Sequence, residues 1–299
     1  MSRSVLRILA VIFVIFDAIG TFVPAAPVWF RWIGRLASPL FLYCMAWSMD
    51  KVRNRKKYLK NVYICSVVMA LLNLFFSITA LFQKVSIAVS TNLFATMFAS
   101  GILISLYDYV KEHPEEKKKV WKIYWAWQLG GVLIWCVLSE IFGVPTNILQ
   151  FIFTIFGNMF LAEGAGLMVA LGLLFYLTKE KGRVMRFAYF MVSFVFFVNA
   201  STGVFGRLLS LLGSDIVLVV VELMTGLSMY GTWVTANFSL DHLLFHDYQW
   251  VMLAALPLLM CCRENPKVKE RKGAQRHYMT ALGYPVAVYF LWFIGNYIL

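Results

Sequence analysis

Two charged side chains, Asp17 and Arg35, interrupt the first two apolar stretches of the sequence. Asp17 lies in VIFVIFDAIGTF, roughly six residues before the end of the first stretch, and Arg35 lies roughly six residues after the start of the second. An isolated charge inside a membrane costs at least about 2.5–3.5 kcal/mol, so each needs a partner or a function. Because only the short turn VPAAP separates the stretches, we predict an antiparallel pair of helices with an Asp17–Arg35 ion pair. The pair is either a structural clamp or part of a polar site, with Asp17 and Arg35 as the catalytic candidates.

Three further ionisable residues lie in apolar sequence. Glu163 stands in the glycine-rich LAEGAG, and Glu222 stands midway through IVLVVVELMTGLSMY. Each is either a substrate-site candidate or a carboxyl group satisfied within the core. Arg207 is either a functional residue within the membrane or a side chain that extends its charge to the membrane surface.

His242 and His246 lie four residues apart in LDHLLFHDYQW, a spacing at which two histidines on a helix can share one metal ion. No glutamate follows the first histidine, and no third ligand is evident in the sequence. We therefore predict an amphipathic turn at the membrane surface, no metal site and no tightly bound cofactor.

The composition identifies a membrane protein. Of the 299 residues 61% are hydrophobic and only 14% are charged, against roughly a quarter charged in soluble domains. Apolar runs of about 20 residues recur without period-2 alternation, so the backbone must span lipid as helices. We predict an all-α polytopic membrane protein, one transmembrane domain over residues 1–299 with about ten or eleven helices. The predicted spans are 5–23, 29–49, 61–82, 85–110, 120–142, 147–177, 187–206, 215–236, 248–262 and 278–299.

The basic residues predict the orientation. Of 27 Lys and Arg, 23 lie at the N-terminus or in four short segments, KVRNRKKYLK, KEHPEEKKKVWK, KEKGRVMR and RENPKVKERKGAQR. Basic loops beside spans are typical of the cytoplasmic side, so we expect a cytoplasmic N-terminus and an outward VPAAP turn. This charge pattern indicates the lipid bilayer as the partner. It does not indicate binding to nucleic acid.

The orientation of the second half depends on residues 147–177. If this run crosses once, with an interruption, then KEKGRVMR is cytoplasmic and RENPKVKERK is outside. If it crosses twice, those two assignments exchange. The glycines around Glu163 allow the chain to bend, so we favour a broken or re-entrant element there, and residues 157–166 should not form a continuous helix.

Several motifs resemble the TraX family of bacterial membrane proteins. They are Asp17-Ala18-Ile19, Gly34-Arg35, Pro39-Leu40-Phe41 and the basic RNRKKYL, followed by weaker matches at TNLFATMFASGIL, LAEGAGLMVALGLLFYL and RHYMTALGYPVAVY. The likeness is good over the first 65 residues and patchy beyond. This family resembles the integral-membrane acyltransferases and acetylates conjugative pilin. The resemblance implies a bacterial inner-membrane protein, acyl-CoA as the donor, and a protein, peptide or envelope acceptor.

The chain departs from the family at two histidines. Ala18 and Ala287 stand where the family has them. The wider acyltransferases also place a basic residue eleven positions before a histidine, and Arg7 keeps that position relative to Ala18. By this resemblance Arg7 and Tyr284, which precedes Pro285, are further substrate-site candidates.

Two hypotheses from different classes follow. In the first, the protein is a TraX-like acyltransferase whose proton-accepting group has moved, since acyl transfer needs a base and histidine is the usual one. In the second, it is a degenerate relative that serves as a scaffold or binds a partner or a lipid. A transporter, suggested by the interruption at Glu163, is a third and weaker alternative.

Overall fold

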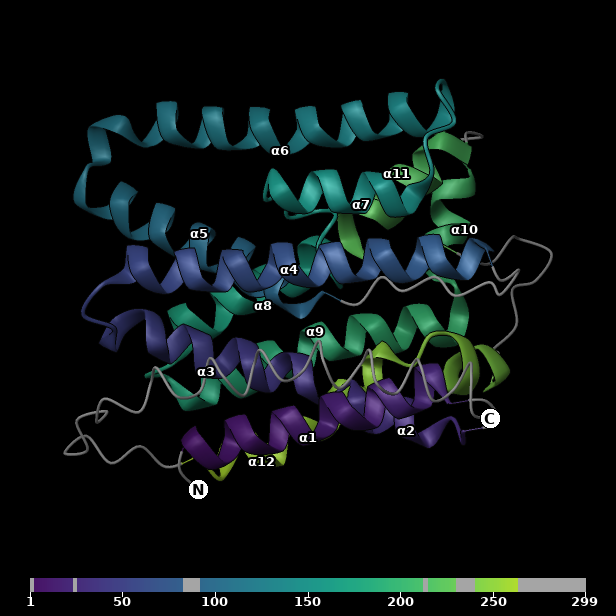
Figure 1. Ribbon diagram of the computed structural model, residues 1–299. Helices are drawn as coiled ribbons and strands as arrows, with labels where there is room; N and C mark the ends of the chain where they lie inside the picture. The colour runs from purple at the N-terminus through teal and green to yellow at the C-terminus, as the bar shows by residue number, and fades with distance from the viewer. Residues whose placement is uncertain (1–2, 24–25, 83–91, 212–214, 230–239, 263–299) are drawn as a thin grey trace. The chain divides into compact units, whose positions relative to one another are not determined.

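The structure, a computed structural model, describes residues 3–23, 26–82, 92–211, 215–229 and 240–262 (Figure 1). Within these residues all regular elements are helices, which confirms the predicted all-α class. Four described helices are long and apolar enough to cross a membrane: α1 (Arg3–Phe22), α4 (Arg55–Phe82), α5 (Leu93–Glu112) and α9 (Gly182–Thr202).

The remaining helices complete the described chain. They are α2 (Trp29–Gly34), α3 (Ala37–Lys51), η1 (Pro114–Glu116), α6 (Lys117–Glu140), α7 (Thr146–Ile155), α8 (Ala165–Thr178), α10 (Val204–Ser210), α11 (Asp215–Thr225), η3 (His242–His246), η4 (Gln249–Ala255) and α12 (Leu256–Met260). The predicted span 278–299 lies outside the described residues.

The chain divides into two compact units. Unit 1 takes its described residues from Met1–Lys51, Leu174–Gly213 and Ser228–Leu299, and unit 2 takes them from Val52–Leu173 and Ser214–Leu227. The single domain over residues 1–299 stays a prediction.

In unit 1, α1 packs along α2 and α3, and η4 packs against α9 (Figure 1). Aromatic contacts hold this unit together: the ring of Phe175 lies 5.6 Å from those of both Tyr43 and Tyr189. Tyr189 is fully buried and donates its hydroxyl hydrogen to the carbonyl of Met252 in η4. A buried hydroxyl that found no acceptor would cost about 1–3 kcal/mol, so this bond fixes η4 on α9.

Prolines explain two differences from the predicted spans. The predicted helix 29–49 is divided after Gly34. Pro39 has no N–H to donate to the carbonyl of Arg35, and its ring opposes a continuous helix there, so α2 and α3 are separate. Pro257 has the same effect on the predicted span 248–262, which forms the 3₁₀ helix η4 followed by the single turn α12.

In unit 2, α4 packs against α5 and α7, and α6 packs against α7 and α5. Small residues of α5 let large side chains from α6 and from the segment after α7 approach closely. The buried cluster comprises Ala95, Ala99, Leu103, Tyr124, Val132, Met159, Phe160, Ala162 and Val169.

The long run 147–177 is interrupted where its glycines lie. Helix α7 ends at Ile155 and α8 begins at Ala165, and Gly157 and Gly164 between them have φ of +65° and +72°. These are left-handed conformations that glycine adopts without strain. Residues 157–164 are thus not helical, as the glycine cluster predicts.

Two side chains satisfy the backbone of this interruption. The side-chain Oε1 of Gln128 in α6 accepts a hydrogen bond from the Met159 N–H at 2.8 Å. The backbone carbonyl of Gln128 accepts one from the side-chain amide of Asn158 at 3.0 Å. The Asn158 side chain in turn accepts from the Phe160 N–H at 3.0 Å. Since Gln128 and Asn158 are both buried, this network replaces the hydrogen bonds that a helix would have made.

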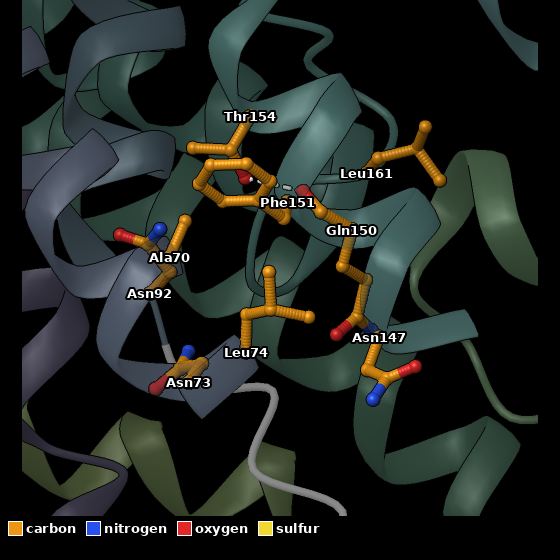
Figure 2. A pocket seen from close by; sticks show the side chains of 9 residues that line it. All are labelled: Ala70, Asn73, Leu74, Asn92, Asn147, Gln150, Phe151, Thr154 and Leu161. Atoms are coloured by element: carbon orange, nitrogen blue, oxygen red, sulfur yellow. Dashed lines mark hydrogen bonds between the residues drawn. The ribbon is translucent and has the colours of Figure 1, made fainter. Parts of the chain in front are cut away.

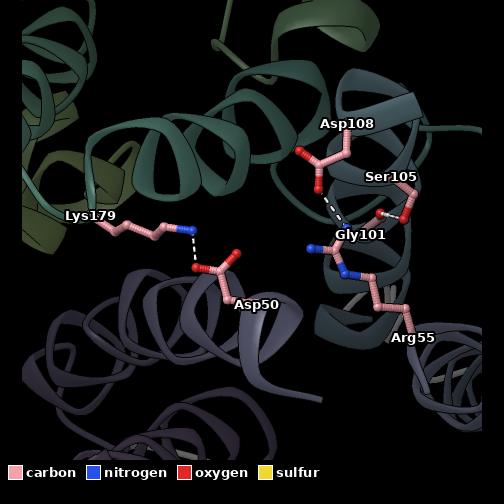
Figure 3. Close-up of polar contacts among 6 residues, drawn as sticks. All are labelled: Asp50, Arg55, Gly101, Ser105, Asp108 and Lys179. Atoms are coloured by element: carbon pink, nitrogen blue, oxygen red, sulfur yellow. Dashed lines mark hydrogen bonds and ion pairs between the residues drawn. The ribbon is translucent and has the colours of Figure 1, made fainter. Parts of the chain in front are cut away.

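Basic residues from three parts of the chain gather at one end of unit 1, which we call the basic end. The guanidinium of Arg3 and the ammonium of Lys51 lie 5.8 and 5.4 Å from the ring of Trp47. Lys179 pairs with Asp50, the residue before Lys51 (Figure 3). Within this unit KEKGRVMR therefore lies at the same end as the N-terminus of α1.

A second ion pair links two helices of unit 2. The guanidinium of Arg55, at the start of α4, contacts the carboxylate of Asp108 near the end of α5 at 2.5 Å (Figure 3). These helices are antiparallel neighbours, so the basic segment before α4 and the one after α5 lie at one end of this unit.

Candidate functional site

Asp17 and Arg35 meet in unit 1. Asp17 Oδ1 lies 3.8 Å from Arg35 Nη2, and the side chains are only 16% and 18% exposed. The predicted ion pair is therefore present, but at a separation longer than a hydrogen bond. Arg35 Nη1 instead donates to Gln249 Oε1 of η4 at 3.3 Å. Asp17 Oδ1 is buried and accepts no hydrogen bond from the described residues.

A glycine makes room for this carboxylate. A Cβ built on Gly34 would lie 2.2 Å from Asp17 Cβ and 2.5 Å from Oδ1, distances that no side chain tolerates. The Gly34-Arg35 dipeptide thus does two things: the glycine lets the Asp17 side chain lie against the backbone of α2, and the next residue supplies the positive charge.

Two guanidinium groups lie near one aromatic ring, and one of them belongs to the Arg35 that pairs with Asp17. Arg31 and Arg35 lie 5.3 and 5.2 Å from the ring centre of Tyr248, within the range of cation–π attraction. The indole N–H of Trp32 donates to the carbonyl of Leu244 at 2.9 Å, which fixes α2 against η3. The site formed by Asp17, Arg31, Arg35, Tyr248 and Gln249 is called the Asp17 site below.

This arrangement can serve acid–base chemistry. A carboxylate oxygen with an unused acceptor position can take a hydrogen bond, or a proton, from an incoming nucleophile. Neighbouring guanidinium groups can stabilise negative charge that develops on an oxygen atom, and they act more strongly in a site that excludes water. The Asp17 site contains both kinds of group.

The other candidates from the sequence do not join this site. Arg7 donates to the buried Ser48 Oγ at 2.8 Å and lies ten residues before Asp17, which is about 15 Å along α1. Glu163 is in unit 2, where its backbone carbonyl accepts from Thr96 at 2.6 Å. Glu222 is exposed on α11 of the same unit. Arg207 donates to the carbonyl of Thr202, and so caps the end of α9.

The two histidines lie in one short helical turn. His242 and His246 form a single π-helical turn, η3, in which His246 Nε2 lies 3.4 Å from the exposed Asp241 carboxylate. Among the described residues no three His, Cys, Asp or Glu side chains come together as metal ligands would. Tyr284, Ala287 and His277 lie outside the described residues.

Unit 2 contains a small amide-lined cavity between α4 and α7 (Figure 2). Its volume of about 20 Å³ is enough for about one water molecule. Asn73, Asn92, Asn147 and Gln150 border it, and Thr154 donates to the Gln150 carbonyl at 2.7 Å. Asn92 also caps α5 by accepting from the Ala95 N–H at 3.1 Å. The cavity therefore fits a bound water better than a substrate.

Sequence reasoning identified Asp17 and Arg35 but missed Arg31, Tyr248 and Gln249. Gln249 is 214 positions from Arg35, and no local spacing connects them. The available signal was the polar DYQ segment after the histidines, which is unusual beside an apolar run.

Comparison with known proteins gave no match: no protein-family model, curated protein or solved structure is significantly similar to this chain. The resemblance to the TraX family stays a prediction from the sequence motifs.

Proposed function

We propose that the protein is a TraX-like integral-membrane acyltransferase that transfers an acyl group from acyl-CoA to a protein, peptide or envelope acceptor. The single observation behind this proposal is the Asp17 carboxylate. Its Oδ1 atom is buried, lies against Gly34, accepts no hydrogen bond from the described residues, and is 3.8 Å from the Arg35 guanidinium. A purely structural clamp would be expected to close into hydrogen-bonded contact.

In the proposed reaction Asp17 replaces the missing family histidines as the base. The acceptor nucleophile, an amine or a hydroxyl group, gives its proton to the Asp17 carboxylate as it attacks the thioester carbonyl. The carbon–sulfur bond then breaks, and the leaving CoA sulfur takes this proton from Asp17 to become the free thiol, which returns Asp17 to its carboxylate form. Arg35 and Arg31 stabilise the negative charge on the carbonyl oxygen during the attack.

The position of Ala18 supports this assignment of the base. Ala18 is buried, with 5% of its surface exposed, so a histidine there would be forced into a packed interface. Introducing the family histidine as Ala18→His should therefore cost about 1–3 kcal/mol by overpacking.

We also propose a membrane orientation in which the basic end of unit 1 faces the bacterial cytoplasm. Asp17 lies fourteen residues after Arg3, about 21 Å further along α1, and so near the outer leaflet. The orientation favours the interpretation in which the interrupted run 147–177 crosses once, with the segment between α7 and α8 as a broken or re-entrant element.

The second candidate function is a scaffold that binds a partner or a lipid. The bond from Arg35 to Gln249 favours it, because Arg35 then has a structural role that would persist without catalysis. A transporter is a weaker alternative, and the interruption after α7 is the feature that favours it.

Acyl transfer by the purified full-length chain in lipid nanodiscs tests the proposal. Free thiol released from acetyl-CoA is measured with an amine-bearing peptide present. Asp17→Asn should lower the rate by about 10²–10⁴-fold, the usual contribution of a general base. Glu140→Gln, which changes an exposed carboxylate of α6, is the matched control and should leave the rate unchanged. Binding of acetyl-CoA without any thiol release would favour the scaffold.

A further inference from the structure

Two residues of the Asp17 site present hydrogen-bond donors that find no acceptor within the described part of the chain. The first is Tyr248. It is only 7% exposed, yet the packing does not close its hydroxyl oxygen off from solvent, and no described residue bonds to that oxygen. The second is Arg31, which is partly exposed and of whose nitrogens the packing closes only Nε. The Tyr248 hydroxyl and the Arg31 Nη groups are therefore open to a ligand from outside the chain.

Both donors are held in place by the fold. A Cβ built on Gly20 of α1 would lie 2.6 Å from Arg31 Cγ, so the stem of Arg31 crosses α1 where a glycine leaves room for it. The Asp17 side chain crosses α2 at Gly34 in the same way. Each helix thus contributes one charged side chain that lies over a glycine of the other. The Arg31 guanidinium then lies 5.3 Å from the centre of the buried Tyr248 ring.

The charge of the site predicts the sign of the ligand. Asp17 and Arg35 form an ion pair at 3.8 Å, which balances one guanidinium. Arg31 makes no side-chain hydrogen bond or ion pair with any described residue, and its contact with the Tyr248 ring leaves its positive charge unbalanced. Guanidinium groups and hydroxyl groups donate well to carboxylate and phosphate oxygens. The group that complements Arg31 and Tyr248 is therefore an anion.

Asp17 sets a second requirement for the ligand. Only Oδ1 of this carboxylate is closed off from solvent, so Oδ2 stays open to a positively charged or hydrogen-bonding group such as an amine. Gly20, which lies under the Arg31 stem, follows Asp17 by three residues, about 4.5 Å along α1. A chain of two carbon atoms between an amine and an anionic group spans about this separation.

We propose that the Asp17 site binds amines that carry a phosphate or carboxylate group two carbon atoms from the nitrogen. The anion accepts hydrogen bonds from Arg31 and from the Tyr248 hydroxyl, and the amine lies against Asp17. As the acyl acceptor this ligand rests on the proposed function, but its binding does not depend on the transfer. Because Arg31 has two Nη groups, it can hold the anion and still donate to the carbonyl oxygen of the thioester.

Thermal unfolding of the purified full-length chain in neutral detergent, without acetyl-CoA, tests this binding. At constant ionic strength phosphoethanolamine and β-alanine should raise the unfolding midpoint in a saturable manner, and ethanolamine, which lacks the anion, should not. Arg31→Gln should raise the half-saturating concentration by about tenfold or more, because charge-assisted hydrogen bonds are lost. Tyr248→Phe keeps the ring and removes one neutral donor, so it should raise that concentration by about two- to tenfold. Without ligand it should leave the midpoint unchanged, since no described residue bonds to the hydroxyl.

Two variants of α9 in the same unit are the matched controls. Arg183→Gln removes an exposed positive charge, and Tyr189→Phe removes a hydroxyl that is bonded to Met252. Both should keep the half-saturating concentration within about twofold, although Tyr189→Phe should lower the midpoint itself. If Arg31→Gln does not fold, Tyr248→Phe decides. No response to either anionic amine, an equal response to ethanolamine, or an unchanged half-saturating concentration in Tyr248→Phe would each overturn the proposed site.

Two further comparisons identify the source and the use of the ligand. Half-saturation at a lower concentration of phosphatidylethanolamine than of phosphoethanolamine would assign the site to a lipid headgroup, and the reverse order would assign it to a soluble amine. Thiol release from acetyl-CoA should show a lower KM for phosphoethanolamine than for ethanolamine, and Arg31→Gln should remove that preference. Saturable binding without thiol release from either amine would overturn the acyl transfer and support the binding site alone.

Discussion

At the scale of single residues, the Asp17–Arg35 pair shows what can and cannot be predicted from two charges at equal distances from a turn. Two charges at equal distances from a short turn must lie level, so their proximity follows from the sequence alone. The 3.8 Å separation and the bond from Arg35 to Gln249 do not follow, because they depend on side-chain torsions and on a helix from the other end of the chain. The role of Gly34 could not be predicted for the same reason, because its close contact with Asp17 depends on how α1 and α2 pack together.

A double-mutant cycle on this pair should show coupling of about 1–3 kcal/mol, the range for charged neighbours that share a partner network. Arg35→Gln should destabilise the chain more than Asp17→Asn, since it removes the bond to Gln249 and leaves the buried carboxylate without its ion-pair partner. Free energies of unfolding are measured in detergent by chemical denaturation. Additive losses would mean that the two charges do not interact.

At the scale of elements, the interruption between α7 and α8 was predictable and the one between α2 and α3 was missed. Gly157 and Gly164 mark the first by their spacing around Glu163. The second has an equally local cause in Pro39, but the apolar run around it suggested one span. How the first interruption is stabilised was beyond the sequence, since Gln128 and Asn158 are 30 residues apart.

Two adjacent glycines of α6 test how that interruption is held. A Cβ on Gly131 would lie 2.3 Å from Asn158 Nδ2, whereas a Cβ on Gly130 meets nothing within 4 Å. Gly131→Ala should therefore destabilise unit 2 by about 1–3 kcal/mol, because Asn158 would have to leave its hydrogen bonds. Gly130→Ala should be neutral or stabilise by up to about 1 kcal/mol through helix propensity. Thermal unfolding measures both, and equal effects would argue against the Asn158 contact.

At the scale of the whole molecule, composition predicts an all-α membrane protein. The described residues confirm the all-α class and include four helices that are long and apolar enough to cross a membrane. The charges of the loops did not decide on which side of the membrane KEKGRVMR lies. In either topology one basic segment would have to lie outside, although basic segments are typical of the cytoplasmic side. The ion pair of Lys179 with Asp50 supplies the missing observation, since it fixes that segment at the basic end of unit 1. The segment RENPKVKERK lies outside the described residues.

Cysteine labelling from outside the cell tests this orientation. The five native cysteines are first changed to serine, and single cysteines are placed at Lys51, Lys181 and Ala26. A membrane-impermeant maleimide should label Ala26→Cys and miss Lys51→Cys and Lys181→Cys, because the last two lie at the basic end. Labelling of Lys181→Cys together with Ala26→Cys would contradict the shared end, and labelling of Lys51→Cys alone would reverse the orientation.

The measurement that tests the central proposal most directly is chemical rescue of the Asp17 carboxylate. Asp17→Ala should release thiol from acetyl-CoA at about 10²–10⁴-fold below the rate of the unmodified chain. Added formate, a small carboxylate that can occupy the vacated space, should restore part of that rate in a saturable manner. It should not change the rate of the unmodified chain or of Glu140→Gln. Full activity of Asp17→Ala without formate would contradict the proposal that Asp17 accepts the proton of the nucleophile.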